Sequence, residues 1–172
     1  MTDPPAAVPA LVAEATKKSD LVWLSAGGPP IAAWHIWYDE AAYTVTGPGE
    51  QPLPGIPGAP TCAVTVRSKA NWGRIVSWEA AVGAVDPGTP EWDAVVPVLL
   101  VKRLNLPDFA SAAQRWAREC VVVRLTPTGR LLEAGASLPD DSGAAPPRPT
   151  PATTPVRVPF TVGRRRRRRA GG

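Results

Sequence analysis

Short apolar runs, each bounded by glycine, proline or acidic residues, dominate the first half of the chain. In one of them, Thr61-Cys-Ala-Val-Thr-Val66, every second residue is fully apolar, which is typical of a β-strand with one buried face. The turn signals Gly27-Gly-Pro-Pro30 and Asp39-Glu40 separate neighbouring runs closely enough for antiparallel pairing. The pattern therefore predicts five successive strands, over residues 20–26, 31–38, 42–46, 61–68 and 74–85.

Helical periodicity replaces this pattern after residue 88. Thr89 can cap a helix, and Pro90 suits its first position. Apolar residues then recur at helical spacing and form one face, made of Trp92, Val95, Val96, Leu99, Leu100 and Leu104. A shorter helix is predicted from Ser111, which forms a capping-box pattern with Gln114, and another over residues 11–18.

One further apolar run, Cys120–Leu125, predicts a last strand, and the turn residues Thr126-Pro-Thr-Gly129 are expected to end it. Five strands, two helices and one strand follow one another in this order. Such an order is typical of a small antiparallel barrel, closed or partly closed, with helices packed on it. We therefore predict a mainly β fold, an antiparallel barrel with two or three packed helices.

Composition divides the chain into three parts. Residues 1–18 are interpreted as a flexible N-terminal segment, within which 11–18 can form the short helix. Residues 19–135 hold the apolar runs and form the predicted barrel domain. Residues 136–172 consist mainly of proline, threonine, alanine, glycine and arginine. Such a composition buries too little apolar surface to offset the entropy lost on ordering, so we predict a disordered tail.

Positive charge is concentrated in the tail. The chain carries a formal net charge of +4, but six of its 19 basic residues are Arg164–Arg169, which leaves 13 basic against 15 acidic residues elsewhere. A basic nucleic-acid-binding domain is therefore not indicated, and nucleic acid is a possible partner only through Arg164–Arg169. A solvated tail with weak, nonspecific affinity is the alternative.

The cysteines indicate neither a disulfide nor a metal site. Cys62 and Cys120 are far apart in the sequence and both lie in apolar runs, so buried free thiols are expected. No metal-ligand spacing occurs elsewhere. The longest apolar run, residues 94–101, is too short to span a bilayer, and the N-terminus does not resemble a signal peptide. We expect a cytoplasmic protein without a membrane span.

The end of the fourth predicted strand carries the strongest chemical signal. Arg67-Ser68-Lys69 places two cations and a hydroxyl directly after an apolar strand. Alternation directs Arg67 and Lys69 to the same face and leaves Ser68 at the rim. A phosphate suits all three groups, because arginine offers a planar fork, lysine a point charge and serine a hydroxyl donor. A solvated strand end is the alternative interpretation.

Three further features leave alternatives open. His35, the only histidine, could serve as an acid or base, although a packed, hydrogen-bonded side chain is favoured. The Gly- and Pro-rich loop 47–60 could be a lid beside a ligand or a rigid surface connection. Glu79, inside a predicted strand, is expected to pair with Arg74 or to line a groove, since burial without a partner would be costly.

These features together resemble the flavin-binding split-barrel superfamily, which includes pyridoxamine 5'-phosphate oxidase-like proteins and flavin or deazaflavin oxidoreductases. The resemblance covers residues 19–130 and rests on the order of elements and on three motifs: Trp34-His-x-Trp37, Thr46-Gly-Pro-Gly-Glu-Gln51 and Arg67-Ser-Lys69. It implies an FMN-binding split barrel that forms a homodimer and holds FMN, or alternatively a deazaflavin, at the subunit interface. The Arg-x-His signature of true pyridoxamine phosphate oxidases is absent, because His35 is the only histidine.

The resemblance also implies the site residues. Arg67, Ser68 and Lys69 would bind the cofactor phosphate, with Arg74 on the next strand as a weaker candidate. Backbone from Gly47 to Gln51 would line the isoalloxazine side, with Trp78 near the ring. No catalytic residue is assigned, because hydride chemistry would belong to the cofactor.

Three functions are consistent with these features. The first is an FMN- or deazaflavin-dependent oxidoreductase that acts on a small molecule. The second is a noncatalytic flavin-binding protein of the same fold. The third is a nucleic-acid-associated protein that uses the Arg164–Arg169 tail. The Gly-x-Ser-x-Gly, phosphate-loop and dinucleotide-binding motifs are all missing from the sequence.

Overall fold

The computed structural model describes residues 10–69 and 73–135. In these ranges it has three helices and seven strands. In chain order they are α1 (Ala10–Lys18), β1 (Leu21–Ser25), β2 (Ile31–Trp34), β3 (Ile36–Tyr38), β4 (Ala41–Thr46), β5 (Thr61–Arg67), β6 (Arg74–Val85), α2 (Pro90–Lys102), α3 (Ala112–Glu119) and β7 (Val121–Ala134). The predicted tail and its arginine run lie outside the described residues.

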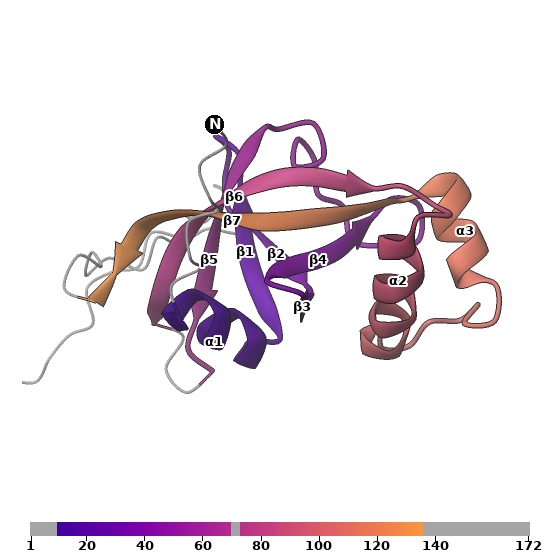
Figure 1. The fold of residues 1–172 in the computed structure, drawn as a ribbon, viewed down its shortest axis with the longest axis horizontal. Coiled ribbons are helices and arrows are strands. Elements are labelled where there is room, and N and C mark those ends of the chain that lie inside the picture. Colours follow the sequence, from indigo (N-terminus) through magenta and orange to yellow (C-terminus); the bar gives the residue numbers. More distant parts are fainter. Residues whose placement is uncertain (1–9, 70–72, 136–172) are drawn as a thin grey trace, which may run out of the picture. The chain divides into compact units, whose positions relative to one another are not determined.

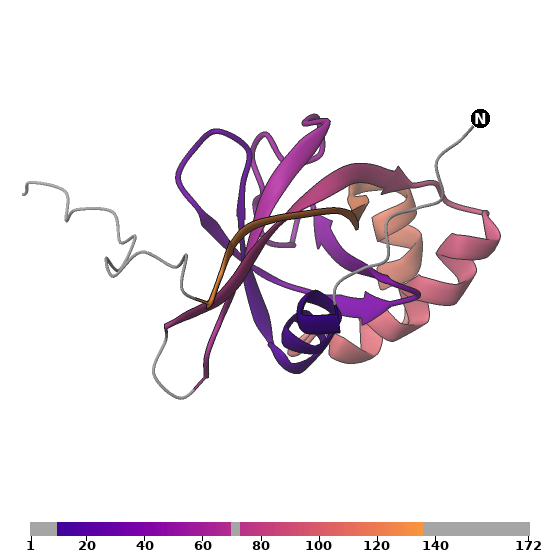
Figure 2. The same ribbon diagram turned by 60° about the vertical axis from the view of Figure 1, so that its left-hand side comes forward.

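All neighbouring strands pair antiparallel, in the order β2-β1-β5-β6-β7-β4-β3. The two outermost strands, β2 and β3, are consecutive parts of one chain segment that is interrupted only at His35. The strand order is therefore cyclic, and the sheet curls round on itself, as Figures 1 and 2 show. The prediction of a mainly β, antiparallel barrel with packed helices is confirmed.

Side chains from elsewhere in the chain explain the interruption at His35. The Trp34 backbone N–H donates to Oε1 of Gln51 at 3.0 Å, and the Trp34 carbonyl accepts from Oγ1 of Thr44 at 2.8 Å. Before this point the segment pairs with β1, and after it with β4. The second predicted strand, 31–38, is therefore two short strands that close the barrel from both sides.

The last strand is longer than predicted. Thr126-Pro-Thr-Gly129 does not end it, because β7 continues along β6 to Ala134 after a shift in register between the Trp78 and Ala80 pairs. Glu79 holds the bulged residues: its carboxylate accepts from Thr128 Oγ1 at 3.1 Å and from Arg130 Nη1 at 3.0 Å. Of the two alternatives for Glu79, pairing with Arg74 is therefore wrong, because its partners are Thr128 and Arg130. Arg74 lies 3.7 Å from Glu133 instead.

Two groups of buried side chains form the core. One fills the barrel and includes Trp78, while the other lies between the sheet and helices α2 and α3 and includes Trp92 and Trp116. The two helices lie side by side at one end of the sheet (Figures 1 and 2). The prediction that Trp92 and Trp116 serve in helix packing is confirmed.

Helix ends follow the predicted signals only in part. Thr89 caps α2, and its Oγ1 accepts from the Trp92 N–H at 3.2 Å. Leu104 was wrongly assigned to the apolar face of that helix, because the helix ends at Lys102 and Leu104 is exposed. The capping box at Ser111 is also wrong, since the Ser111 hydroxyl donates to the Asp108 carbonyl instead.

Helix α1 belongs to the folded unit. Val12 is buried with the barrel core, and the Thr16 carbonyl accepts a hydrogen bond from His35. The predicted short helix over residues 11–18 is therefore confirmed, and it packs on the barrel core. None of the helices in the described part of the chain has the length and apolar character needed to cross a bilayer.

Candidate functional site

The predicted phosphate cluster lies where β5 ends. Along this strand Cys62, Val64 and Val66 are buried, while Arg67 lies on the opposite face and is partly exposed. The register between β5 and β6 shifts after Val66, so that Arg67 pairs with Arg74 across the two strands. Two like charges directly opposite each other repel, and Glu133, 3.7 Å from Arg74, offsets part of that repulsion. We call Arg67, Ser68 and Lys69 the cation site.

An aromatic ring orients the guanidinium of Arg67. The carbon at the centre of the guanidinium lies 5.0 Å from the centroid of the Trp23 ring, on neighbouring strand β1. Such a cation–π contact contributes about 0.5–1 kcal/mol at an exposed position. The contact restricts the arginine side chain, whose planar guanidinium suits stacking on an aromatic ring.

A carboxylate faces the lysine of the cation site. Asp20 Oδ2 lies 2.6 Å from Lys69 Nζ, and Asp20 Oδ1 lies 3.2 Å from Lys102 Nζ at the end of α2. The bonds to Lys69 and then Lys102 hold the pKa of Asp20 below its ordinary value. Asp20 is therefore ionised at neutral pH. Its two ion pairs link the start of β1 to the end of β5 and to the end of α2.

Two hollows border the cation site. One of about 340 Å³ lies toward α1 and has Leu11, Ala15 and Ile75 in its wall. The other, of about 270 Å³, has Leu21 and Trp23 in its wall. Ser19 and the three residues of the cation site line both hollows. The cationic groups therefore lie between two partly apolar spaces.

A third and larger hollow adjoins the second. It measures about 520 Å³ and shares Asp20 and Leu21 with the 270 Å³ hollow. Its wall continues through Trp34 to the segment Val101–Leu104, where Val101 and Leu104 are strongly exposed. One side of the protein thus offers positive charge at the cation site and, beyond it, a wall that combines apolar and aromatic side chains with Lys102 and Arg103.

The other predicted site residues make separate contacts. Gly47 lies against the backbone of Cys120, and the Gln51 side chain is bound to Trp34 and Thr44. Trp78 is only 1 % exposed and packs edge-on against Trp37, with ring centroids 6.3 Å apart. The structure brings Arg67, Ser68, Lys69 and Arg74 together, and it gives Gly47, Gln51 and Trp78 packing and hydrogen-bonding roles elsewhere.

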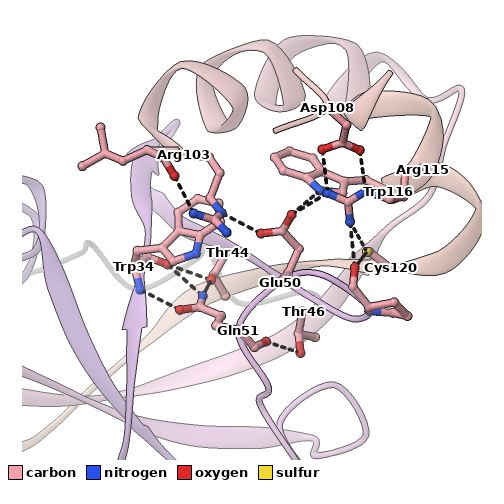
Figure 3. A network of polar contacts seen from close by, with 12 residues as sticks. Trp34, Thr44, Thr46, Glu50, Gln51, Arg103, Asp108, Arg115, Trp116 and Cys120 are labelled. Atoms are coloured by element: carbon pink, nitrogen blue, oxygen red, sulfur yellow. Dashed lines mark hydrogen bonds and ion pairs between the residues drawn. The ribbon is translucent and has the colours of Figure 1, made fainter. Parts of the chain in front are cut away.

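Sequence reasoning missed the most heavily bonded acidic residue, Glu50 (Figure 3). Its side chain is 0 % exposed. One carboxylate oxygen accepts from Arg103 Nε at 2.8 Å, and the other accepts from Arg115 Nη2 at 2.8 Å and Trp116 Nε1 at 2.9 Å. Burial alone would raise the pKa of Glu50, but hydrogen bonds from Arg115, Arg103 and Trp116 lower it below its ordinary value. The signal available in the sequence was a lone carboxylate within a loop of glycine and proline.

These contacts show how the loop 47–60 is held. Arg115 also donates to the Pro48 carbonyl at 2.7 Å and to Asp108 at 2.7 Å. Further along the loop, Leu53 and Ile56 are buried in the barrel core. Of the two interpretations of this loop, a rigid connection is therefore favoured over a lid.

The conformation of Gly47 leads to a stability prediction. Its φ is +144°, and a Cβ added there would lie 2.8 Å from the Cys120 Cα. We expect Gly47→Ala to lower the free energy of unfolding by at least about 2 kcal/mol, because strain and a backbone clash coincide. Urea unfolding followed by tryptophan fluorescence measures the change. Gly28→Ala is the matched control, since nothing lies within 4 Å of its added Cβ, and an equal loss there would contradict this reason.

His35 has the packed, hydrogen-bonded role that the sequence favoured. The side chain is 2 % exposed, and its Nε2–H donates to the Thr16 carbonyl at 2.9 Å. Its Nδ1 is buried, and none of the described residues offers it a hydrogen bond. Burial lowers the pKa of His35, and the Thr16 carbonyl offsets this only in part. The ring is therefore neutral at pH 7.

Because His35 is neutral in the folded protein, we predict that the free energy of unfolding depends on pH. Because the pKa of His35 is lower in the folded chain than in the unfolded chain, the unfolded state binds the extra proton first as pH falls. The free energy of unfolding should be constant above about pH 6.5 and fall below it, by at most about 1.4 kcal/mol per pH unit. Urea unfolding at pH 7.5, 6.5 and 5.5 measures this slope. His35→Gln removes the only histidine, so an unchanged slope in that variant would assign the effect to other groups.

Comparisons with known proteins show similarity in fold at low sequence identity. No protein-family model and no curated protein sequence matches the chain. Among solved structures, HutZ, a heme storage protein from Vibrio cholerae, is 14 % identical with a TM-score of 0.49, over 70 % of this chain and 90 % of that protein. An FAD-binding protein from Mesorhizobium loti is 14 % identical with a TM-score of 0.46, over 70 % and 88 %.

A putative pyridoxamine 5'-phosphate oxidase from Listeria innocua is 13 % identical with a TM-score of 0.45, over 70 % of this chain and 94 % of that protein. Sequence identities this low indicate similarity of fold alone. The chemistry of the site therefore depends on the residues of this chain.

Proposed function

We propose that this protein binds FMN or a deazaflavin by its phosphate at the cation site and acts as an oxidoreductase on a small molecule. The observation that carries the proposal is the placement of Arg67, Ser68 and Lys69 between two hollows at the end of one strand. Arginine and lysine provide charge-assisted donors for phosphate oxygens, and Arg74 lies directly across from Arg67.

The residues present fit a ligand with a phosphate and an aromatic ring system. The cation site supplies the donors for the phosphate. The adjoining 270 Å³ and 520 Å³ hollows have Leu21, Trp23 and Trp34 in their walls, which suit an aromatic ring, and Lys102 and Arg103 also line the larger one. Bound flavin or deazaflavin would itself supply hydride transfer, and these side chains would bind and orient it. The placement of Gly47, Gln51 and Trp78 near the ring stays a prediction.

A homodimer is part of the proposal. The sequence resemblance implies one, and exposed apolar side chains beside the 520 Å³ hollow support it. They are Leu21, Val101 and Leu104. A second copy packed there would cover this surface and enclose the hollow.

Location of the protein in the cytoplasm stays a prediction as well.

The first experiment is an absorption spectrum of the purified protein, followed by titration with FMN and with a deazaflavin. We expect bound chromophore, or binding of at least one of these two ligands at micromolar concentration or below. A colourless protein that binds neither would contradict the proposal. Turnover with reduced nicotinamide donors then separates an oxidoreductase from a protein that only binds the cofactor.

A further inference from the structure

The Asp20 carboxylate already forms an ion pair with Lys69, the lysine of the cation site. Asp20 pairs through Oδ2 with Lys69 and through Oδ1 with Lys102, at 2.6 Å and 3.2 Å. The three side chains are all well exposed, Asp20 by 64 %. An ion pair exposed to this degree contributes only about 0–1 kcal/mol, so a stronger anion can displace it.

Asp20 also lies at a boundary within the proposed binding surface. It lines both the 270 Å³ hollow, which contains the cation site, and the 520 Å³ hollow, which contains Trp34. Lys69 lines only the first of these two hollows and Lys102 only the second. The Asp20 carboxylate therefore lies at the boundary between the two hollows, with an ammonium group on each side.

We propose that Asp20 is an internal competitor for the phosphate of the ligand and so determines which anions the cation site accepts. A phosphate dianion offers more charge and more acceptor oxygens than one carboxylate, so it can take Lys69 from Asp20. Asp20 then keeps Lys102 as its partner and is not left unpaired. A monoanion gains less from Lys69 and competes poorly. This inference rests on the proposed role of the cation site.

The test is Asp20→Asn, which keeps the shape of the side chain and removes its charge. We expect the variant to bind FMN roughly two- to fivefold more tightly than the wild type, the range that corresponds to one exposed ion pair. Riboflavin lacks the phosphate, so its affinity should not change. Isothermal titration at fixed ionic strength measures both ligands, and pyrophosphate serves as a probe without a ring.

Glu14→Gln is the matched control. Glu14 lines the 340 Å³ hollow on the other side of the cation site, and it pairs with Lys18 at 2.8 Å. The substitution makes the same change in charge without releasing Lys69. If Glu14→Gln tightens FMN binding as much as Asp20→Asn does, the effect is one of net charge and the inference is overturned.

The outcomes separate this inference from the proposed function. Equal FMN affinity in the wild type and in Asp20→Asn overturns the competition but leaves the flavin site standing. Tighter pyrophosphate binding by Asp20→Asn, without binding of any flavin or deazaflavin by either protein, supports the competition and contradicts the proposed function. Absence of binding to all of these probes in both proteins overturns both.

Discussion

Glu50→Ala is expected to lower the free energy of unfolding by about 3–5 kcal/mol, because it removes one partner of a buried ion pair. The Glu50 carboxylate is fully covered and accepts from Arg103, Arg115 and Trp116. Without it, two guanidinium groups lose a charged acceptor, and the indole N–H of Trp116, a buried residue, loses its bond. The same change would remove the bonds from the loop 47–60 to Arg103, directly after α2, and to Trp116 of α3, and would leave the Arg115 bond to the Pro48 carbonyl. Urea unfolding followed by tryptophan fluorescence measures the loss.

Two further variants make this expectation specific. Asp108 also binds Arg115, through Oδ2 at 2.7 Å, but its side chain is partly exposed. Asp108→Asn should therefore cost clearly less than Glu50→Ala. Glu50→Gln keeps the shape of the side chain and one acceptor oxygen but removes the charge, so it should fall between the two. A loss for Glu50→Ala no larger than that for Asp108→Asn would show that the buried carboxylate does not hold the loop.

Local patterns in the sequence were enough to predict much of the fold. Alternation in residues 61–66 identified β5 and its buried face, because a strand packed on one side needs a period of two. Thr89 followed by Pro90 marked the start of α2, because both residues act within the first helical turn. The cluster Arg67-Ser68-Lys69 could be found for the same reason, since its three members are adjacent in the sequence.

Features that depend on distant residues could not be predicted in this way. The ends of β7 depend on Glu79, a residue of another strand, which binds Thr128 and Arg130 and turns an expected chain turn into a bulge. The interruption at His35 depends on Gln51 and Thr44. Glu50 finds its partners 53 to 66 positions further along the chain. Tertiary contacts decide each of these, and no short window of sequence contains both partners.

The cation site leads to the second large expected effect. Replacing both Arg67 and Lys69 with alanine should weaken FMN binding about a hundredfold or more, because each charge-assisted hydrogen bond to phosphate contributes about 1.5–3 kcal/mol. The affinity for riboflavin should change little by comparison, since riboflavin has no phosphate. Isothermal titration of the wild type and the variant with both ligands measures the difference.

Two controls separate loss of the site from loss of the fold or of charge. Arg67→Gln with Lys69→Gln keeps part of each apolar stem but loses the guanidinium over Trp23, a contact of about 0.5–1 kcal/mol, so this variant should unfold at close to the wild-type urea concentration and still bind FMN weakly. Arg118→Ala with Arg130→Ala removes two positive charges from α3 and from the β7 bulge, and FMN binding should stay close to the wild type. If the Arg67 and Lys69 variants bind FMN within about threefold of this control, a difference no larger than one exposed ion pair produces, the phosphate does not bind at the end of β5. The 520 Å³ hollow beside Trp34 would then have to hold the ligand without the cation site.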